Sequence, residues 1–376
     1  MSEIDKIEVS VIRIEANRAY RMAGMETGGT NYFGIVTDLT TRDGVHGVSE
    51  IFVTPGWYAP DTPDGTIGVI KKFFAPALVD RSVFDTEAIN VELDRLWMGN
   101  LFAKAAIEMA VHDAAAKTLG RPLCDLLGGR LRDRFEVVGG IGLETPETMA
   151  AQAVEYKDRD FQTIKLKIGA PGNPQLDIDR VRAVREAIGP KLKIRIDANG
   201  VFEAPDAIAL IRKLEAFDLD HVEQPVPGHR IDAMADIRQA IGVLLMADES
   251  VHSVDDALRV VTAKAADVVK IKMAKCGGFR RSRQIADLCA AAGVETVIGQ
   301  GMGTSLQALA ELHLACSTSA ITPAGEFIGP DKLTGDVADA PMVLEGGAAL
   351  LPSEPGLGAD LNRDALEKLK LPIFGA

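Results

Sequence analysis

The sequence predicts an α/β protein in which a (β/α)7β barrel follows an α+β domain. Three observations lead to this fold class. From about residue 131 onward, short apolar runs alternate with amphipathic helical patterns; charged residues end several of these runs roughly every 25 residues; and the first 130 residues lack the alternation. A repeat of that length suits one strand, one helix and two loops, so the charged residues are expected at one end of a parallel barrel.

The first 130 residues predict strands followed by helices. Residues 1–60 contain alternating runs such as IEVSVIRIEA and a turn signal, RDGVHG, whereas apolar residues recur at three- and four-residue spacing in 66–127. Two segments rich in Gly, Pro, Met or aromatic residues, 18–30 and 54–65, are expected to be loops. We therefore predict an α+β domain over residues 1–130.

The barrel is predicted over residues 131–350, with residues 351–376 returning to the N-terminal domain. Amphipathic patterns such as APDAIALIRKLEAF separate its strands. The strand-like runs are 137–141, 163–168, 193–197, 220–224, 244–248, 267–272, 295–299 and, less regularly, 319–327.

Composition excludes several classes of protein. The 376-residue chain has a formal net charge of −13, which argues against a general nucleic-acid or acidic-membrane binder. Its N-terminus lacks the basic start and apolar core of a signal peptide, and no window approaches 18 uninterrupted apolar residues. The four cysteines form no C-x-x-C pair, so we expect buried free thiols and a cytoplasmic location.

Three carboxylates end successive strand-like runs and predict a metal site. Asp197, Glu223 and Asp248 stand in DANG, VEQP and ADES, with no cluster of His or Cys beside them. A single acid at such a position is more often a helix N-cap or an ion-pair partner. Three on adjacent strands indicate a hard oxygen site for Mg²⁺, with Mn²⁺ as the alternative.

Lysines flank the three carboxylates. Lys165 and Lys167 share one face of a strand because residues i and i+2 point the same way, and Lys272 ends a strand across the barrel. A divalent ion that holds a substrate carboxylate between two lysines suits abstraction of the proton on the α-carbon. Three other lysines are expected at solvated strand ends or on the surface: Lys264, Lys270 and Lys275.

The remaining motifs carry weaker signals. None of the six histidines forms a ligand pair or falls in the seventh strand, and no G-x-G-x-x-G or nucleophile motif is present. The Gly-rich segment GQGMGTS, residues 299–305, follows the seventh strand and is a candidate carboxylate-binding turn.

Taken together, these motifs resemble the enolase superfamily, in its muconate-lactonizing-enzyme (muconate cycloisomerase) subgroup of the mandelate racemase/muconate lactonizing enzyme family. The resemblance rests on KLK (165–167), DANG, VEQP, ADES and KIKMAKCGG (270–278). It extends to AKAAIEMAVHDAAAKTLGRPLCDLLGG (103–129) and PGLG (355–358). It implies a modified TIM barrel whose mouth is covered by an N-terminal capping domain, with residues 18–30 and 54–65 as lid loops.

The resemblance also implies roles for individual residues. Asp197, Glu223 and Asp248 would bind Mg²⁺, and Lys167 and Lys272 would act as the acid/base pair. Lys165 would assist electrostatically or bind the substrate, and Asn199 and Glu249 would support the metal ligands. Glu326 matches a Glu of muconate cycloisomerases and would also contact the substrate or act electrostatically.

The implied enzyme is an isomerase that acts on a small carboxylate through an enediolate and forms a homo-oligomer, a dimer or an octamer. Cycloisomerisation of a muconate-type substrate is the first choice. Racemisation or epimerisation of an amino-acid derivative is the alternative, and dehydration through the same intermediate is a third. Residues 18–30, 54–65 and 299–305 depart from the muconate enzymes, so the substrate stays open. A non-enzymatic binding barrel is disfavoured because both catalytic lysines and all three ligands are present.

Overall fold

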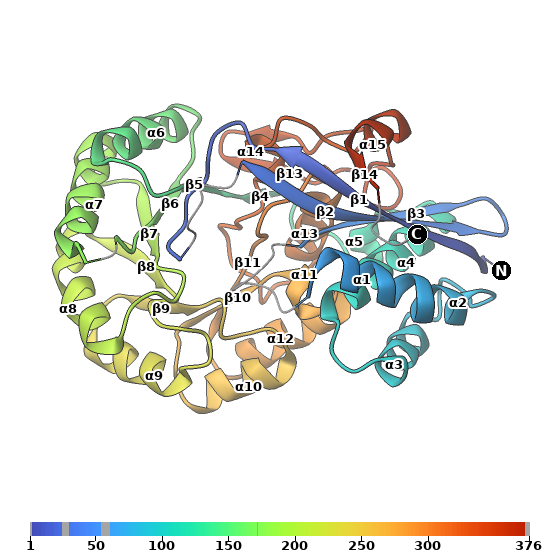
Figure 1. Ribbon diagram of the computed structural model, residues 1–376, viewed down its shortest axis with the longest axis horizontal. Helices are drawn as coiled ribbons and strands as arrows, with labels where there is room; N and C mark the ends of the chain where they lie inside the picture. The colour runs from blue at the N-terminus through green and yellow to red at the C-terminus, as the bar shows by residue number, and fades with distance from the viewer. Residues whose placement is uncertain (1, 25–29, 54–60, 171, 373–376) are drawn as a thin grey trace.

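The computed structural model of the chain describes residues 2–24, 30–53, 61–170 and 172–372. Figure 1 shows two regions side by side. One is a curled sheet ringed by helices, formed by the middle of the chain; in the other, the N-terminal strands and helices lie beside the C-terminal helix α15. The predicted α/β class with a preceding sheet-and-helix region is confirmed.

The chain begins with an antiparallel sheet. Its long strands are β1 (Ile4–Glu15), β2 (Asn31–Thr41) and β3 (His46–Phe52), as the alternating pattern predicted. The turn between β2 and β3 contains Gly44, whose φ of 83° is a left-handed conformation that costs glycine little. The short strand β14 (Lys370–Leu371) pairs with β1, so the C-terminal segment joins this sheet.

Helices follow where the helical spacing predicted them. They are α1 (Pro63–Val69), η1 (Ile70–Phe74), α2 (Ala75–Leu78), α3 (Thr86–Leu96), α4 (Leu101–Thr118) and α5 (Leu123–Leu126). The alanine-rich α4 is buried along most of its length, because β3 packs closely on it. A Cβ at Gly47 of β3 would lie 2.2 Å from the carbonyl oxygen of Ala110, so only glycine allows this approach.

Seven parallel strands form the barrel sheet in the order β11-β10-β9-β8-β7-β6-β5, so sequential strands are neighbours. Each strand falls within or beside the run predicted for it. The strands are β5 (Val138–Ile141), β6 (Thr163–Lys167), β7 (Lys193–Asp197), β8 (Leu219–Glu223), β9 (Leu244–Ala247), β10 (Val268–Ile271) and β11 (Glu295–Ile298).

The predicted eighth strand is replaced by isolated bridges. Thr322 and Glu326 donate backbone hydrogen bonds to β11 at 2.8 and 2.9 Å, whereas Gly325 exchanges bonds of 2.8 Å with Glu136 and Val138 on the other side. Pro323 lies in the middle of this segment and has no N–H to donate, which explains why no continuous ladder forms. The segment 321–326 nevertheless hydrogen-bonds to both ends of the curled sheet and closes it.

Helices surround the barrel sheet on its outer side (Figure 1). The main ones are α6 (Pro146–Asp158), α7 (Pro174–Ile188), α8 (Ala204–Leu214), α9 (Ile231–Ala240), α10 (Val254–Thr262), α12 (Phe279–Ala291) and α13 (Ser305–Ser317). Shorter elements are η2 (Glu215–Phe217), α11 (Met273–Cys276), α14 (Gly329–Lys332), α15 (Arg363–Leu369) and a small sheet of β4 (Arg134–Glu136), β12 (Leu344–Glu345) and β13 (Ala348–Leu350).

Two buried acids of α4 connect the N-terminal helices to the rest of the chain. The Glu108 carboxylate accepts from the backbone N–H groups of Phe279 and Arg280 at 2.8 and 3.0 Å, at the N-terminus of α12. Asp113 accepts from the N–H groups of Val48 and Leu357, both at 2.8 Å. These bonds satisfy buried backbone donors of β3, the barrel and the C-terminal segment, and they fix where the N-terminal sheet stands over the barrel.

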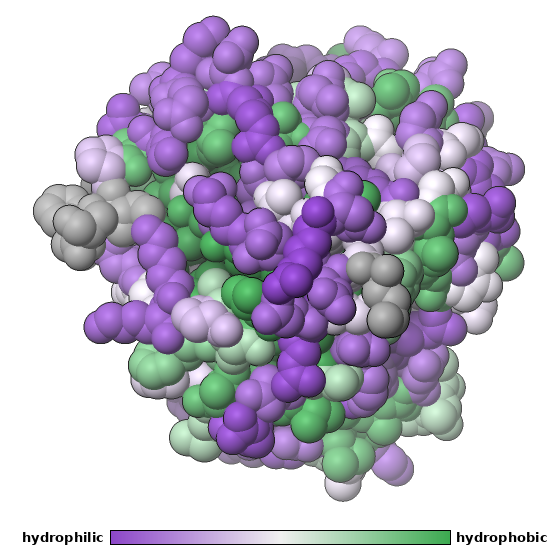
Figure 2. Space-filling view, turned by 90° about the vertical axis from the view of Figure 1, so that its right-hand side faces the viewer, coloured by the Kyte–Doolittle hydropathy of each residue, from purple (hydrophilic) through white to green (hydrophobic). Residues whose placement is uncertain are grey.

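The outer face of the N-terminal region carries both polar and apolar side chains. Figure 2 views this side and shows apolar residues interspersed with polar ones. Several exposed apolar residues lie between residues 73 and 98, including Phe73 and Trp97, whose ring centroids are 4.6 Å apart. Among the described residues, no helix is both long enough and apolar enough to cross a membrane.

Asp113→Ala should destabilise the chain, because it leaves the buried N–H groups of Val48 and Leu357 without an acceptor. We expect the free energy of unfolding to fall by about 2–4 kcal/mol, measured by urea denaturation followed by circular dichroism. Asp236→Ala, at an exposed position on α9, is the control and should change it by less than about 0.5 kcal/mol. Equal stability of the two variants would contradict this account of Asp113.

Candidate active site

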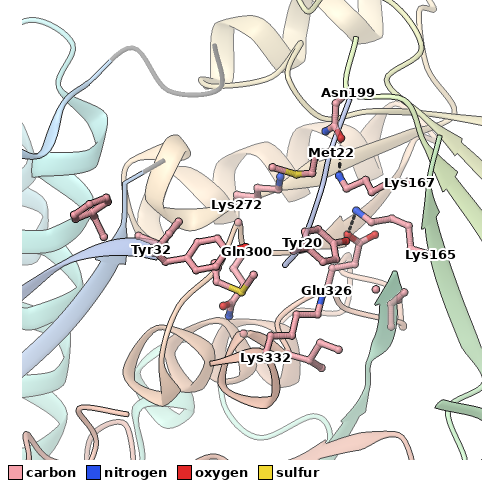
Figure 3. A pocket seen from close by; sticks show the side chains of 18 of the residues that line it. Tyr20, Met22, Tyr32, Lys165, Lys167, Asn199, Lys272, Gln300, Glu326 and Lys332 are labelled. Carbon is pink, nitrogen blue, oxygen red and sulfur yellow. Dashed lines mark hydrogen bonds and ion pairs between the residues drawn. The ribbon is translucent and has the colours of Figure 1, made fainter. Parts of the chain in front are cut away.

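A cavity of about 240 Å³ lies at the C-terminal ends of the barrel strands. The N-terminal sheet supplies one wall through Tyr32, Phe33 and Phe52, and the barrel supplies lysines on the other side (Figure 3). Loop residues Tyr20 and Met22 also line the cavity. The cavity is therefore built jointly by the two regions of the chain.

The barrel register brings the predicted charged residues together. Lys167 on β6 lies opposite Asp197 on β7, which in turn lies opposite Glu223 on β8. Asp248 follows the last residue of β9, and Lys272 follows the last residue of β10. Because the strands are parallel and in register, all five residues stand at one end of the barrel.

Each predicted catalytic lysine is bonded to one of the three acids. The Lys167 Nζ donates to Asp197 Oδ2 at 2.6 Å, and the Lys272 Nζ donates to Asp248 Oδ2 at 2.6 Å. Lys165, on the same strand as Lys167, donates to Asp197 and Glu223 at 3.1 Å each. All six side chains are buried, so the attraction within each pair is screened far less than it would be on the surface.

The prediction that Lys270 and Lys275 lie at solvated strand ends is wrong. Lys270 is 0% exposed and donates to Glu223 Oε2 at 2.5 Å, and Lys275 is 1% exposed and donates to Asp248 Oδ1 at 2.6 Å. Lys270 precedes Lys272 by two residues and therefore points to the same face of the strand. Lys264 is exposed, as expected.

A sequence signal for Lys270 exists, because KIK at 270–272 repeats the pattern of KLK at 165–167 on the other side of the acids. No such signal marks Lys275, which reaches Asp248 from the single-turn helix α11. Lys270 and Lys275 therefore bring positive charge to Glu223 and Asp248, respectively.

Glu326 lies beside the inner lysines. Its Oε2 accepts from Lys270 at 2.6 Å and also from Lys165. Burial raises the pKa of Glu326, but the ammonium groups of Lys165 and Lys270 outweigh burial and hold it well below the usual range. Burial lowers the pKa of Lys165, yet Glu223, Glu326 and Asp197 together raise it well above its usual value. Lys165 is therefore held as a cation.

The three acids differ in ionisation. Burial raises the pKa of Asp197, but Lys167 and Lys165 lower it further than burial raises it. Lys272 and Lys275 lower the pKa of Asp248 in the same way, against the effect of burial. Glu223 behaves differently: burial and then the negative charge of Asp197 raise its pKa to about 8, in spite of Lys165 and Lys270.

The donor set of the three acids fits a hard divalent cation. The Oε1 atom of Glu223 is buried without a hydrogen-bond partner, and burial, followed by the negative charge of Asp197, raises the pKa of this acid. In the described part of the chain, no three His, Cys, Asp or Glu side chains are arranged to hold a metal ion, and the ammonium groups of lysines lie against oxygens of these acids. Three carboxylates and no sulfur or imidazole donor suit Mg²⁺.

Asn199 and Glu249 form a second layer around the acids. Asn199 accepts from the Lys167 Nζ at 2.7 Å and donates to Glu249 Oε1 at 3.0 Å. Its backbone N–H donates to Asp197 Oδ1 at 3.0 Å, and its φ of 46° lies in the left-handed region that asparagine tolerates. This turn orients both Lys167 and Asp197.

The predicted specificity segments are partly described. Residues 25–29 and 54–60 of the two predicted lid loops lie outside the described residues. Gln300, Gly301 and Met302, from the Gly-rich segment 299–305, line the cavity. The Nε2 of Gln300 donates to the buried Glu311 at 3.1 Å.

Tyr20 and Lys332 are two cavity residues that had not been singled out, although Tyr20 lies in the predicted lid segment 18–30. Tyr20 comes from the first lid loop, and Lys332 ends α14, directly after the closing segment of the barrel. The Lys332 Nζ lies 4.2 Å from the centroid of the Tyr20 ring. Tyr20 lies outside helices and strands, and Lys332 ends a four-residue helix, so no strand or helix period could have identified them.

Comparisons with known proteins place these observations in a family. Residues 6–128 match the family model "Mandelate racemase / muconate lactonizing enzyme, N-terminal domain", and residues 148–365 match "Enolase C-terminal domain-like". Muconate cycloisomerase 1 of Rhodococcus opacus is 31% identical over 97% of each chain. N-succinyl-L-Arg/Lys racemase of Bacillus cereus is 33% identical over 89% of this chain and 89% of the relative.

Solved structures agree with the family models. Muconate lactonizing enzyme from Pseudomonas fluorescens, complexed with muconolactone, has a TM-score of 0.94 at 30% identity, covering 98% of this chain and 100% of the other. Dipeptide epimerase from Enterococcus faecalis, complexed with Mg and the dipeptide L-Leu-L-Tyr, has a TM-score of 0.89 at 29% identity, covering 95% and 99%. The chain therefore belongs to the enolase superfamily, as an isomerase of its mandelate racemase/muconate lactonizing enzyme family.

Proposed function

We propose that the chain is a Mg²⁺-dependent enzyme that removes or returns the proton on the carbon next to a substrate carboxylate. One observation carries the proposal. Lys167 on β6 and Lys272 after β10 flank the three strand-end acids, and each donates a 2.6 Å hydrogen bond to one of them. Two lysines on either side of a bound substrate can exchange protons with both faces of its α-carbon.

Asp197, Glu223 and Asp248 would hold the metal. When bound, Mg²⁺ would stabilise the negative charge that develops on the substrate carboxylate as the proton leaves. The chain's own residues supply the remaining steps. One of Lys167 and Lys272 takes the proton and the other donates one, while the hydrogen bond from Lys167 to Asn199 orients that ammonium group. Lys165, held as a cation between acids, adds electrostatic stabilisation without exchanging its proton.

Cycloisomerisation of a muconate-type dicarboxylate is the net reaction we favour. The muconate cycloisomerase of Rhodococcus opacus covers nearly the whole chain, and Glu326, the residue that motivated the subgroup assignment, lies in the cavity wall. Racemisation of an N-acylated amino acid is the second candidate, favoured by a similar likeness to the N-succinyl-L-Arg/Lys racemase of Bacillus cereus. Both reactions pass through an enediolate: racemisation and lactone opening form it by removing the α-proton, whereas lactone formation from a muconate forms it by ring closure and then adds a proton.

We further propose a cytoplasmic location and a homo-oligomer, either a dimer or an octamer. The four cysteines are buried and unpaired, which suits a reducing compartment. Analytical ultracentrifugation would distinguish the two oligomers from a monomer.

We retain the division into a capping domain (1–130), a barrel (131–350) and a returning segment (351–376) as a proposal.

Lys167→Ala and Lys272→Ala should each lower the rate of α-proton exchange by about 10²–10⁴-fold, because each removes one proton-transfer group. The measurement is deuterium incorporation from D₂O into N-succinyl amino acids and into the lactones formed from muconates, read by mass spectrometry. Lys264→Ala, at an exposed position, is the control and should exchange at the wild-type rate. Full exchange by the Lys272→Ala variant would refute the two-lysine assignment.

Removal of the metal should abolish turnover, and added Mg²⁺ should restore it. EDTA treatment followed by titration with Mg²⁺ tests this directly. Asp248→Asn should weaken Mg²⁺ binding by about ten-fold or more in calorimetry, since even residues behind a ligand contribute that much. Undiminished turnover in EDTA would exclude the metal-dependent mechanism.

A further inference from the structure

The side chain of Lys332 lines the cavity. Lys332 is the last residue of α14, the helix that follows the closing segment 321–326. Its Nζ lies 4.2 Å from the centroid of the Tyr20 ring, a cation–π contact. In Figure 3 it approaches from the side opposite Lys167 and Asn199. It also lines a smaller adjoining cavity of about 120 Å³.

Lys332 has no carboxylate partner in the described part of the chain. Its neighbour Asp331 is engaged by Arg159, whose two terminal nitrogens donate at 3.0 and 2.7 Å. Glu326 Oε2 already accepts from Lys165 and Lys270. Burial, followed by the positive charges of Lys165 and Lys167, lowers the pKa of Lys332 to about 7. Lys332 therefore has no ion-pair partner among the described residues, and an anion in the cavity would favour its charged form.

The barrel topology places Lys332 across the cavity from the three acids. Glu223 ends β8, the middle strand of the seven, whereas the segment that leads to Lys332 bridges the two outermost strands, β11 and β5. A substrate whose reacting carboxylate sits at the acids would extend its far end toward Lys332. Apolar side chains, including Phe52, Met302 and Ile328, line the cavity and suit the carbon chain in between.

The charge of the cavity wall also favours a substrate with an anionic group at its far end. Among the described residues, those that line the cavity include four lysines and one carboxylate, Glu326. A cationic group at the far end of the substrate would meet the unpaired Lys332 and be repelled, whereas an anionic group would form a charge-assisted hydrogen bond there.

We propose that Lys332 binds a second carboxylate of the substrate, so that the chain acts on dicarboxylates. This inference rests on the proposed function, which places the reacting carboxylate of the substrate at Asp197, Glu223 and Asp248. The role of Lys332 is to bind and position the far end of the substrate, and it takes no part in proton transfer.

The test uses the Mg²⁺-loaded full chain and pairs of simple probes in calorimetry. Dicarboxylates of four to eight carbons, from succinate to suberate, are compared with monocarboxylates of the same length, such as adipate with hexanoate. We expect the best-fitting dicarboxylate to bind at least about ten-fold more tightly than its monocarboxylate, the value of a charged hydrogen bond. Lys332→Met should reduce this preference to within about two-fold and leave monocarboxylate binding unchanged.

Two control variants separate charge from packing. Lys332→Arg retains the positive charge and should keep the preference for dicarboxylates, and Lys213→Met, at an exposed position on α8, should behave as wild type. If Lys332→Met does not fold by circular dichroism, Lys332→Gln and the wild-type comparison decide. Equal binding of the two probe classes by the wild type, or an undiminished preference in the neutral variant, would overturn the proposal.

The binding test is independent of turnover. A dicarboxylate preference that depends on Lys332, without any α-proton exchange, would support the role of Lys332 and refute the proposed chemistry. Exchange on monocarboxylate substrates without a dicarboxylate preference would refute the role of Lys332 and leave the chemistry intact.

Discussion

The structure depends on burying a group of acids and lysines together at one end of the barrel. An isolated charge in that position would be very unfavourable, because it would lose its hydration without compensation. The parallel register solves this problem by setting Lys167, Asp197 and Glu223 side by side on three neighbouring strands. Each acid therefore meets at least one ammonium group, and the reactive side chains are held in place before any ligand arrives.

The N-terminal region supplies a wall of the cavity that lies at the open end of the barrel. The acids of α4 attach it to the barrel and to the C-terminal segment through buried backbone donors. That attachment brings Tyr32 and Phe52 over the open end of the barrel, where they face the lysines. The barrel strands therefore supply the charged groups, whereas the N-terminal sheet and the loops supply much of the cavity wall.

Sequence periodicity identified the features that repeat. Asp197, Glu223 and Asp248 could be found because each ends a strand, and one strand follows another at nearly constant spacing. Lys270 was misjudged, although its spacing from Lys272 requires both to face inward. The eighth strand was the least clear of those predicted, and Pro323 interrupts its hydrogen bonds. The contact between Tyr20 and Lys332 was missed because one residue lies in a loop and the other ends a four-residue helix, and such contacts follow from tertiary structure alone.

The sharing of oxygens among the buried lysines has an evolutionary consequence. Glu223 Oε2 accepts from both Lys165 and Lys270, so loss of either lysine would leave an acid short of positive charge. Single substitutions within this group are therefore harmful, and viable change would require paired replacements. Lys332 stands outside that constraint, because no carboxylate of the described residues relies on it. A lineage could exchange this lysine in one step and alter the cavity wall while the buried acids and lysines at the strand ends stayed the same.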